Sequence, residues 1–482
     1  MAIMTKQNPS FMGTAGSRAG LGHGEASKAA KARRVEPSSS NCFDVDKQTW
    51  KDLDLFDQGR RGLIFTLFNK TKTTGGADAL ERMMKEVCLG RPVLETRRDI
   101  IRFFVDRNIE LRIGRQLADV EHYLNCAFEL FPGNWLESLY YQVRNQLKET
   151  PRYYTVTGGI KRTVSLLRHL FEITAGWKGS DCPGQLAVTL EELPELIADK
   201  RVRALLMERS GPLRWRDMAR CDHFFRESGK SATRRLLDLL YEWDAYQSVA
   251  ATAQQYDLCF PQYSDDRQPS IQAEGLFHPL VANAVPNDYA IGSTANLCFI
   301  SGPNMAGKST FLKSFGLAVY LAHVGFPVPA RSFQTTIFDG LITTINLADS
   351  ISQGYSHFYA EVNRVKEVVT SIYEKKRVVV IFDELFRGTN VKDASDASLE
   401  IIDAFAGIEG SLFLVSTHIV EIAVELQDNR NIFFTCLSAT MEGDVPWYSY
   451  KLKSGVSDER AGMMILRNEG ILDLLKKIRK NS

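Results

Sequence analysis

Apolar residues recur at three- and four-residue spacing through most of residues 43–256, which is the pattern of amphipathic helices. Proline and glycine clusters interrupt the pattern where turns between helices are expected. No constellation of catalytic side chains accompanies it. The spacing predicts a mainly helical scaffold, with its clearest helices at residues 100–109, 113–131, 162–173 and 233–253.

The pattern changes at about residue 271, where short apolar runs begin to alternate with helical segments, as in an α/β sheet. Residues 297–300 and 378–382 are continuously apolar, which is typical of strands buried on both faces of a parallel sheet. Residues 411–417 predict a third strand, and residues 309–323 predict a helix. The sequence therefore predicts a helical region followed by an α/β region.

The turn between the first strand and its helix reads G-P-N-M-A-G-K-S-T, which fits the phosphate-binding pattern G-x-x-x-x-G-K-[ST]. Its glycines let the backbone fold around phosphate oxygens, which the positive end of the helix faces. Lys308 is expected to reach the β- and γ-phosphates, and the Ser309 hydroxyl to ligate Mg²⁺. An ordinary glycine-rich turn is the alternative. The predicted nucleotide-binding residues are Gly302, Pro303, Asn304, Met305, Ala306, Gly307, Lys308, Ser309 and Thr310.

Two acidic residues, Asp383 and Glu384, end the second apolar run. A carboxylate at the carboxyl end of a central strand lies where open α/β sheets bind Mg²⁺ and phosphate. Asp383 therefore suits the Mg²⁺ site, directly or through a water molecule, and Glu384 is placed to polarise the attacking water. Two acids in a solvated turn would be the better interpretation if the pair stood alone.

His418 follows the third strand and is the third polar group expected at the same sheet edge. An imidazole there could donate to the γ-phosphate and sense hydrolysis. A histidine that is merely exposed or hydrogen-bonded at a strand end is the alternative. The predicted catalytic residues are Glu384, Lys308 and His418.

These motifs, in this order, resemble the MutS family of mismatch-repair ATPases, a branch of the ABC-type P-loop enzymes. The loop matches the family's except for Ala306, where the family usually has glycine. The stretch from Asp383, D-E-L-F-R-G-T, resembles "D-E-x-x-R-G-T", and S-T-H ending at His418 resembles "A-T-H". In the first half the similarity is diffuse, and residues 63–80 resemble the start of the family's core domain.

The resemblance implies an α/β ABC-type P-loop ATPase domain at residues 263–482, preceded by a mainly α-helical core and lever domain at residues 45–262. It implies ATP and Mg²⁺ as cofactors and a composite site in a homodimer, in which Ser356 approaches the neighbour's γ-phosphate. His357 stands where the family has threonine. A polar turn capping a helix at residues 360–371 is the alternative for this segment. Nothing ahead of the core resembles the family's mismatch-recognition domain, so we expect that domain to be missing.

The charge composition limits how the chain could bind DNA. The chain has 59 basic and 58 acidic residues, a net charge of +1, so DNA binding requires local patches. One candidate begins at Lys200 and ends at Arg235, with eleven Lys/Arg against four Asp/Glu and interleaved aromatics. A solvated helix face with its aromatics in the core is an equal alternative. Residues 1–44 are rich in Gly, Ala, Ser and Lys, which predicts a disordered, mildly basic tail.

Eight scattered cysteines without C-x-x-C spacing predict reduced thiols in a cytoplasmic protein, with no metal site of their own. No apolar run is long enough to span a bilayer, so no membrane partner is expected. We therefore expect an ATP-dependent DNA-binding protein that hydrolyses ATP as a nucleotide-bridged dimer in mismatch repair or related repair and recombination. The alternative is a nucleotide-gated scaffold with negligible hydrolysis and no mismatch recognition.

Overall fold

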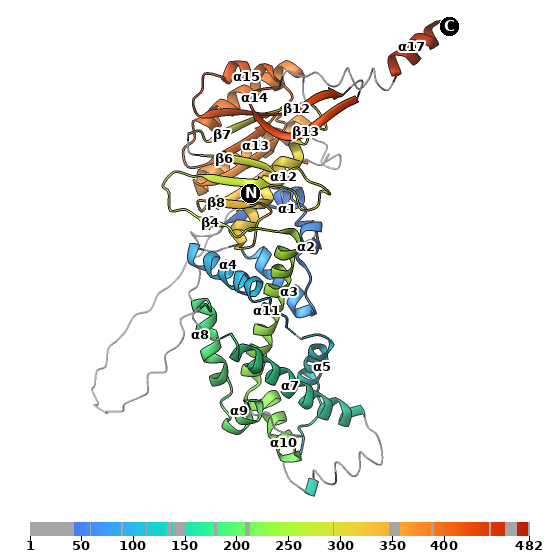
Figure 1. Ribbon diagram of the computed structural model, residues 1–482, viewed down its shortest axis with the longest axis vertical. Coiled ribbons are helices and arrows are strands. Elements are labelled where there is room, and N and C mark those ends of the chain that lie inside the picture. Colours follow the sequence, from blue (N-terminus) through green and yellow to red (C-terminus); the bar gives the residue numbers. More distant parts are fainter. Residues whose placement is uncertain are drawn as a thin grey trace, which may run out of the picture. The chain divides into compact units, whose positions relative to one another are not determined.

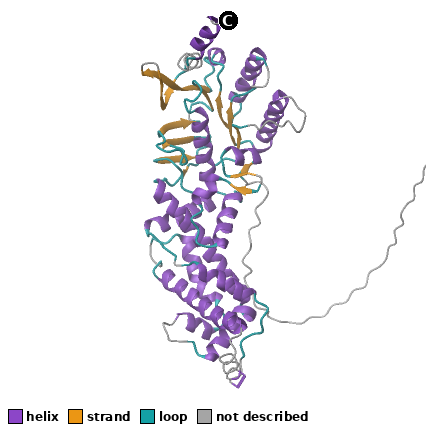
Figure 2. Cartoon of the chain, turned by 90° about the vertical axis from the view of Figure 1, so that its right-hand side faces the viewer, coloured by secondary structure: helices purple, strands orange, loops and turns teal. Residues whose placement is uncertain are grey.

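The computed structural model is drawn in Figure 1, and Figure 2 shows its helices and strands from a second side. It describes residues 43–57, 59–87, 90–111, 113–132, 136–137, 140, 151–177, 181–207, 213–292, 294–346, 357–386, 390–442, 445–457 and 470–480. All of these belong to one compact unit, Ser39–Ser482. The predicted basic tail, apart from its last two residues, lies outside the described residues.

Helices make up most of the described residues between 63 and 256. They are α2 (Leu63–Phe68), α3 (Thr74–Lys85), α4 (Arg91–Asp106), α5 (Arg115–Asn125), α7 (Pro151–Ala175), α8 (Gly184–Glu192), α9 (Lys200–Met207), α10 (Trp215–His223) and α11 (Lys230–Tyr256), with a 3₁₀ turn at Leu193–Leu196 and a π turn at Phe224–Ser228. The long α11 packs against α3 and α4. Its buried Asp244 accepts hydrogen bonds from the backbone N–H groups of Lys72 (3.0 Å) and Thr73 (3.0 Å), which fixes the start of α3.

The helix predicted at residues 113–131 ends earlier, at Asn125, and this part of the prediction is wrong. A buried ion pair explains the difference. The carboxylate of Asp222 accepts a hydrogen bond from the backbone N–H of Phe131 (2.6 Å). Arg226, paired with Asp222 at 2.6 Å, donates to the carbonyl of Phe128 (2.6 Å). These long-range partners satisfy the backbone of the segment after Asn125 in place of helical hydrogen bonds.

A seven-stranded sheet forms the centre of the second half, in the order β1-β9-β10-β11-β7-β12-β13. Its strands are β1 (Asp44–Val45), β9 (Gly340–Thr344), β10 (Val378–Asp383), β11 (Leu412–Ser416), β7 (Leu297–Ser301), β12 (Ile432–Glu442) and β13 (Val445–Ser454). All neighbours are parallel except β12 and β13. The three predicted strands are confirmed as β7, β10 and β11, and they are buried throughout, as their apolar sequences require.

Helices and a smaller sheet complete this half. The helices are α12 (Lys308–Val324), α13 (His357–Lys375), α14 (Val391–Ala406), α15 (Glu421–Leu426) and α17 (Ile471–Lys480). A four-stranded sheet runs in the order β4-β8-β5-β6, with β4 (Gln262–Tyr263), β8 (Ser332–Thr335), β5 (Ile271–Leu276) and β6 (Asn287–Ile291). Strands and helices alternate in this half, which agrees with the α/β region predicted from the sequence. The expected boundary between the helical domain and the α/β domain, between residues 262 and 263, falls inside β4.

The segment that follows the predicted tail, residues 44–52, packs against the large sheet, although the sequence predicted it almost entirely as part of the helical domain. Strand β1 pairs with β9 at the edge of the large sheet, and the short helix α1 (Lys47–Asp52) packs against β9. A two-stranded hairpin, β2 (Phe56–Asp57) with β3 (Arg60–Arg61), then leads to α2. The sequence offered no signal for this pairing, because a strand of two residues has no recognisable period.

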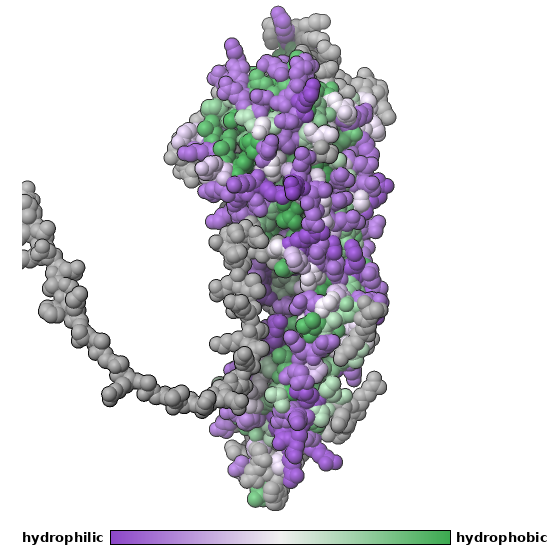
Figure 3. All heavy atoms as spheres, turned by 90° about the vertical axis from the view of Figure 1, so that its left-hand side faces the viewer, coloured by the Kyte–Doolittle hydropathy of each residue, from purple (hydrophilic) through white to green (hydrophobic). Residues whose placement is uncertain are grey.

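No helix among the described residues is long and apolar enough to cross a membrane. On the face drawn in Figure 3, hydrophilic residues predominate and the hydrophobic ones form separate groups.

His323 lies near the end of α12 and is 1% exposed, with its ring stacked on Phe43 at a centroid distance of 4.2 Å. Its Nδ1 lies 2.8 Å from the carbonyl of Val319, and its Nε2 accepts a hydrogen bond from the backbone N–H of Phe338 (3.0 Å). Both contacts suit the neutral ring with the proton on Nδ1. Burial lowers the pKa of His323 to about 4.

We expect this histidine to make folding stability depend on pH. The unfolded chain binds the proton near pH 6.5, so the stabilisation is complete above that pH and is lost as pH falls toward 4, by about 3 kcal/mol. Urea unfolding at pH 7 and pH 4.5 measures the loss. In His323→Gln, which does not titrate, the difference between the two pH values should shrink by about 2 kcal/mol. An unchanged difference would contradict the assignment.

Candidate nucleotide-binding site

The loop between β7 and α12 contains three residues with positive φ. Gly302 has φ 146°, Met305 has φ 68° and Gly307 has φ 99°. The first of these lies in a region that only glycine readily adopts. A Cβ atom at Gly302 would also lie 2.4 Å from the carbonyl oxygen of Leu437 in β12. The loop can therefore take this path between strand and helix only because glycine occupies position 302.

Lys308, the first residue of α12, is buried with 6% of its surface exposed. Its Nζ donates hydrogen bonds to the carbonyls of Gly302 (2.7 Å) and Pro303 (3.2 Å), and lies 3.5 Å from Nδ1 of His418. The loop carbonyls thus hold the ammonium group inside the turn, close to His418 at the end of β11.

Asp383 joins the loop to the ends of two neighbouring strands. It is 6% exposed, and its Oδ2 accepts a hydrogen bond from the hydroxyl of Ser309 in α12. Its Oδ1 accepts another from the hydroxyl of Ser416, the residue paired with it across β10 and β11. Carboxylate and hydroxyl oxygens are the donor type that Mg²⁺ prefers, so this set of side chains fits that ion.

Oε1 of Glu384 contacts Nε2 of His418 beside the same group of side chains. Glu384 has φ 64°, and its backbone N–H donates to the carbonyl of Ser416 (3.0 Å). The backbone N–H of Thr417 donates to the carbonyl of Ile300 in β7 (3.2 Å), which brings the end of β11 to the base of the loop. These backbone contacts hold the ends of β10 and β11 together at the base of the loop.

The structure brings together the predicted catalytic and metal-binding side chains from three elements, namely α12 and the ends of β10 and β11. Direct contacts join Lys308 to His418, His418 to Glu384, and Ser309 to Asp383. Ser356 lies outside the described residues, as do residues 387–389 of the D-E-x-x-R-G-T motif. The role of Ser356 stays a prediction.

Comparison with known proteins identifies the region around this site. Residues 298–478 match the family model "MutS domain V". This region is therefore similar to domain V of the MutS family. The chain is 30% identical over 249 residues to the DNA mismatch repair protein MutS of Geobacillus sp. (strain WCH70), covering 50% of this chain and 28% of the relative.

Two other relatives extend this comparison. The DNA mismatch repair protein MutS of Lactobacillus helveticus is 28% identical over 328 residues, 66% of this chain and 36% of the relative. The DNA mismatch repair protein MSH3 of Vanderwaltozyma polyspora is 29% identical over 247 residues, 49% of this chain and 24% of the relative. The matches to these three relatives thus span only 24% to 36% of each relative's length.

Two parts of this site were missed by the sequence analysis. One is the contact that Ser416 makes with Asp383, although a serine at the end of an apolar strand was a visible signal. The other is a cavity of about 340 Å³ beside the loop. It is lined by His278, Ala284, Met305, Gly307, Phe311 and Tyr450, among others. Burial lowers the pKa of His278, which favours a neutral ring there.

The candidate DNA-binding stretch from residue 200 to residue 235 is only partly a basic surface. Phe224 and Phe225 are buried, and Arg226 has 6% of its side chain exposed in the ion pair with Asp222. Phe224 and Phe225 therefore belong to the core, whereas Trp215 is only partly buried and has the guanidinium of the exposed Arg216 over its ring at 5.1 Å. The predicted interleaving of aromatics with surface cations thus holds for Trp215 and not for the two phenylalanines. Among the described residues of this stretch, the exposed lysines and arginines are Lys200, Arg201, Arg214, Arg216, Lys230, Arg234 and Arg235.

Proposed function

We propose that this chain is a Mg²⁺-dependent ATPase that couples ATP binding to DNA binding in mismatch repair or related DNA repair and recombination. One observation carries the proposal. The hydroxyl of Ser309 and the carboxylate of Asp383, 74 positions apart in the sequence, share a hydrogen bond beside the buried Lys308. A hydroxyl, a carboxylate and an ammonium group at a strand–loop–helix turn are the side chains that phosphoryl transfer uses.

The chain's own groups divide the work as follows. Lys308 and the loop amides hold the β- and γ-phosphates, and Ser309 with Asp383 holds Mg²⁺. Bound Mg²⁺ supplies electrostatic stabilisation of the negative charge on the phosphate oxygens. Glu384 orients a water molecule and takes its proton, while His418 donates to the γ-phosphate.

The cavity beside the loop is the place we propose for the base of the nucleotide. It opens along Met305, Ala306 and Gly307, so a phosphate chain held by the loop would leave its base on this side. Asn287 secures the opposite wall, because its Nδ2 donates to the carbonyl of Tyr450 (2.9 Å) and its Oδ1 accepts from the N–H of Leu452 (2.8 Å). Mixed polar and apolar walls suit a planar heterocycle.

The proposals for the dimer and for DNA binding rest on the resemblance to the MutS family. We propose a homodimer bridged by nucleotide, with Ser356 acting on the partner's γ-phosphate, and DNA contacts from the helical half. The exposed basic residues between Lys200 and Arg235 would neutralise phosphates without reading sequence.

The test measures ATP turnover and DNA binding together. Mismatched, matched and four-way-junction DNA compete for the protein at several salt concentrations, with and without Mg²⁺-ATP. We expect Mg²⁺-dependent hydrolysis, and DNA affinity that falls steeply with salt as phosphate contacts require. Binding of ATP without turnover and without salt-dependent DNA affinity would favour the nucleotide-gated scaffold. Equal affinity for all three DNAs would remove mismatch recognition from the proposal.

A further inference from the structure

The outer edge of β9 is completed by side chains where its strand partner ends. Strand β1 pairs only with Gly340 and Leu341. Beyond them, the backbone N–H of Thr343 donates to the hydroxyl of Thr49 in α1 (2.8 Å). The N–H groups of Ile345 and Asn346 donate to the carboxylate of Asp52 in α1, at 2.9 and 3.0 Å.

Asp52 is fully buried and saturated by donors. Its Oδ2 also accepts a hydrogen bond from the hydroxyl of Thr343 (2.8 Å), and its Oδ1 accepts one from Nε2 of Gln48 (2.9 Å). The same Gln48 amide donates to the carbonyl of Asn346 (2.9 Å). A single carboxylate thus replaces the missing strand as the acceptor for the end of β9, and backbone groups buried there have these side chains as partners.

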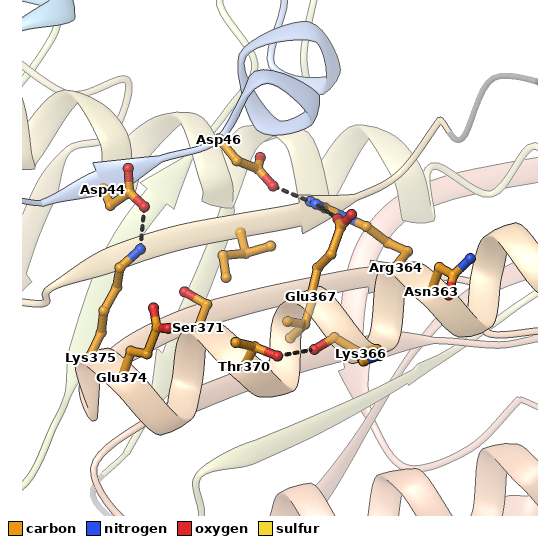
Figure 4. Close-up of a pocket in the computed structure, with 12 residues that line it drawn as sticks. Asp44, Asp46, Asn363, Arg364, Lys366, Glu367, Thr370, Ser371, Glu374 and Lys375 are labelled. Atoms are coloured by element: carbon orange, nitrogen blue, oxygen red, sulfur yellow. Dashed lines mark hydrogen bonds and ion pairs between the residues drawn. The ribbon is translucent and has the colours of Figure 1, made fainter. Parts of the chain in front are cut away.

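A second tie joins α1 to α13 through the buried Arg364, as Figure 4 shows. Nη1 of Arg364 lies 2.5 Å from the carboxylate of Asp46, the residue that caps the start of α1. Its Nη2 donates to the carbonyl of Thr343 (2.8 Å), and its Nε to the hydroxyl of Thr344 (3.1 Å). The last residues of β9 are therefore held from both sides.

The end of β9 lies directly beside the proposed Mg²⁺ site. Thr344 pairs with Phe382 in β10, the residue before Asp383. The same N-terminal segment reaches the loop helix α12, since a Cβ atom at Gly316 would lie 3.1 Å from Leu53 and Asp54 pairs with Lys313 at 3.6 Å. The segment that leads into the helical half is thus anchored on both structural elements of the site.

We propose that Asp52 is a positioning residue for the nucleotide site. This proposal rests on the proposed Mg²⁺-ATPase function. By holding the end of β9, it keeps the end of β10 in register and sets Asp383 and Glu384 opposite the loop. The loop itself is separated from β9 by β10 and β11 in the sheet. Loss of Asp52 should therefore affect Mg²⁺ and turnover far more than binding of the metal-free nucleotide.

The experiment compares Asp52→Leu with Asp244→Leu, a matched control in the helical half. Both remove a buried carboxylate that accepts backbone N–H groups. In Asp52→Leu we expect kcat to fall about tenfold and the half-saturating Mg²⁺ concentration to rise about fivefold, because small displacements of catalytic groups are costly. ATP affinity in EDTA should stay within about twofold of the wild type, since the loop is intact.

Asp244→Leu should lower the thermal midpoint without changing the Mg²⁺ requirement or kcat of the folded protein. Asp52→Asn, which keeps one acceptor oxygen, should restore most of the activity. If Asp52→Leu does not fold, Thr49→Val removes only the acceptor for Thr343 and should still raise the Mg²⁺ requirement about twofold. A wild-type Mg²⁺ requirement in folded Asp52→Leu would overturn the role of Asp52 alone. Where that variant does not fold, a wild-type requirement in Thr49→Val would overturn the premise that side chains of α1 hold the end of β9 in place for the site. A wild type that binds no ATP would overturn the proposed function and, with it, this role.

Discussion

Replacement of Glu384 by glutamine is expected to reduce ATP turnover by a factor of about 100 or more while leaving ATP affinity within about threefold of the wild type. Glutamine keeps the shape of the side chain and a hydrogen bond to His418, but it cannot accept the proton of the attacking water. Lys308 and Ser309, which contact the phosphates and Mg²⁺ in the proposed mechanism, are unchanged. Steady-state hydrolysis and equilibrium binding of a fluorescent ATP analogue measure the two quantities separately.

The matched control for this variant is Glu409→Gln, which makes the same chemical change at an exposed position in the same half of the chain. It should leave both turnover and affinity unaltered. Undiminished hydrolysis in Glu384→Gln would remove Glu384 from the role of general base. A parallel loss of ATP affinity would instead assign the carboxylate to binding, through its contact with His418.

The parts of the site that could be predicted from the sequence are those encoded by neighbouring residues. An apolar run followed by G-P-N-M-A-G-K-S-T specifies strand, turn and helix locally, because the turn needs glycine and the helix follows directly. The sequence predicted Asp383, Glu384 and His418 because all three lie within two residues of the end of a predicted strand. Parallel strands end at the same sheet edge, so their terminal residues lie close together without any further information.

The parts that could not be predicted depend on contacts between distant segments. The helix expected to run to residue 131 stops at Asn125 because Asp222 and Arg226, about 100 positions later, supply its partners. The pairing of β1 with β9 joins segments nearly 300 residues apart, and two residues carry no period. The role of Asp52 could not be predicted either, because the residues next to it in the sequence indicate only a polar end of a helix.

The position of Asp52 also explains why the N-terminal segment belongs to the nucleotide-binding half. A short edge strand gives few hydrogen bonds, and the rest of the β9 edge would be left with unsatisfied donors. Thr49 and Asp52 satisfy them from a helix, and that helix continues into the chain that builds the helical half. The segment that leads into the helical half is therefore fixed beside the proposed site by side-chain hydrogen bonds as well as by the pairing of β1 with β9.

Gly302→Ala is expected to weaken ATP binding by a factor of about 100, because it displaces the phosphate-binding loop. The new methyl group would lie 2.4 Å from the carbonyl oxygen of Leu437, and Leu437 cannot move freely because it pairs with Leu452 next to a bulge in β12. The φ of 146° adds backbone strain for any residue with a side chain. Isothermal titration with ATP in the presence of Mg²⁺ measures the loss.

Gly455→Ala separates the effect of the collision from that of strain alone. Gly455 also has a positive φ, 109°, but a Cβ atom there would meet nothing within 4 Å. Its replacement should cost about 1 kcal/mol of folding stability and leave ATP affinity within about twofold. Equal ATP affinities for the two variants would mean that the loop tolerates the contact with Leu437, and the proposed path of the phosphates around Gly302 would then be wrong.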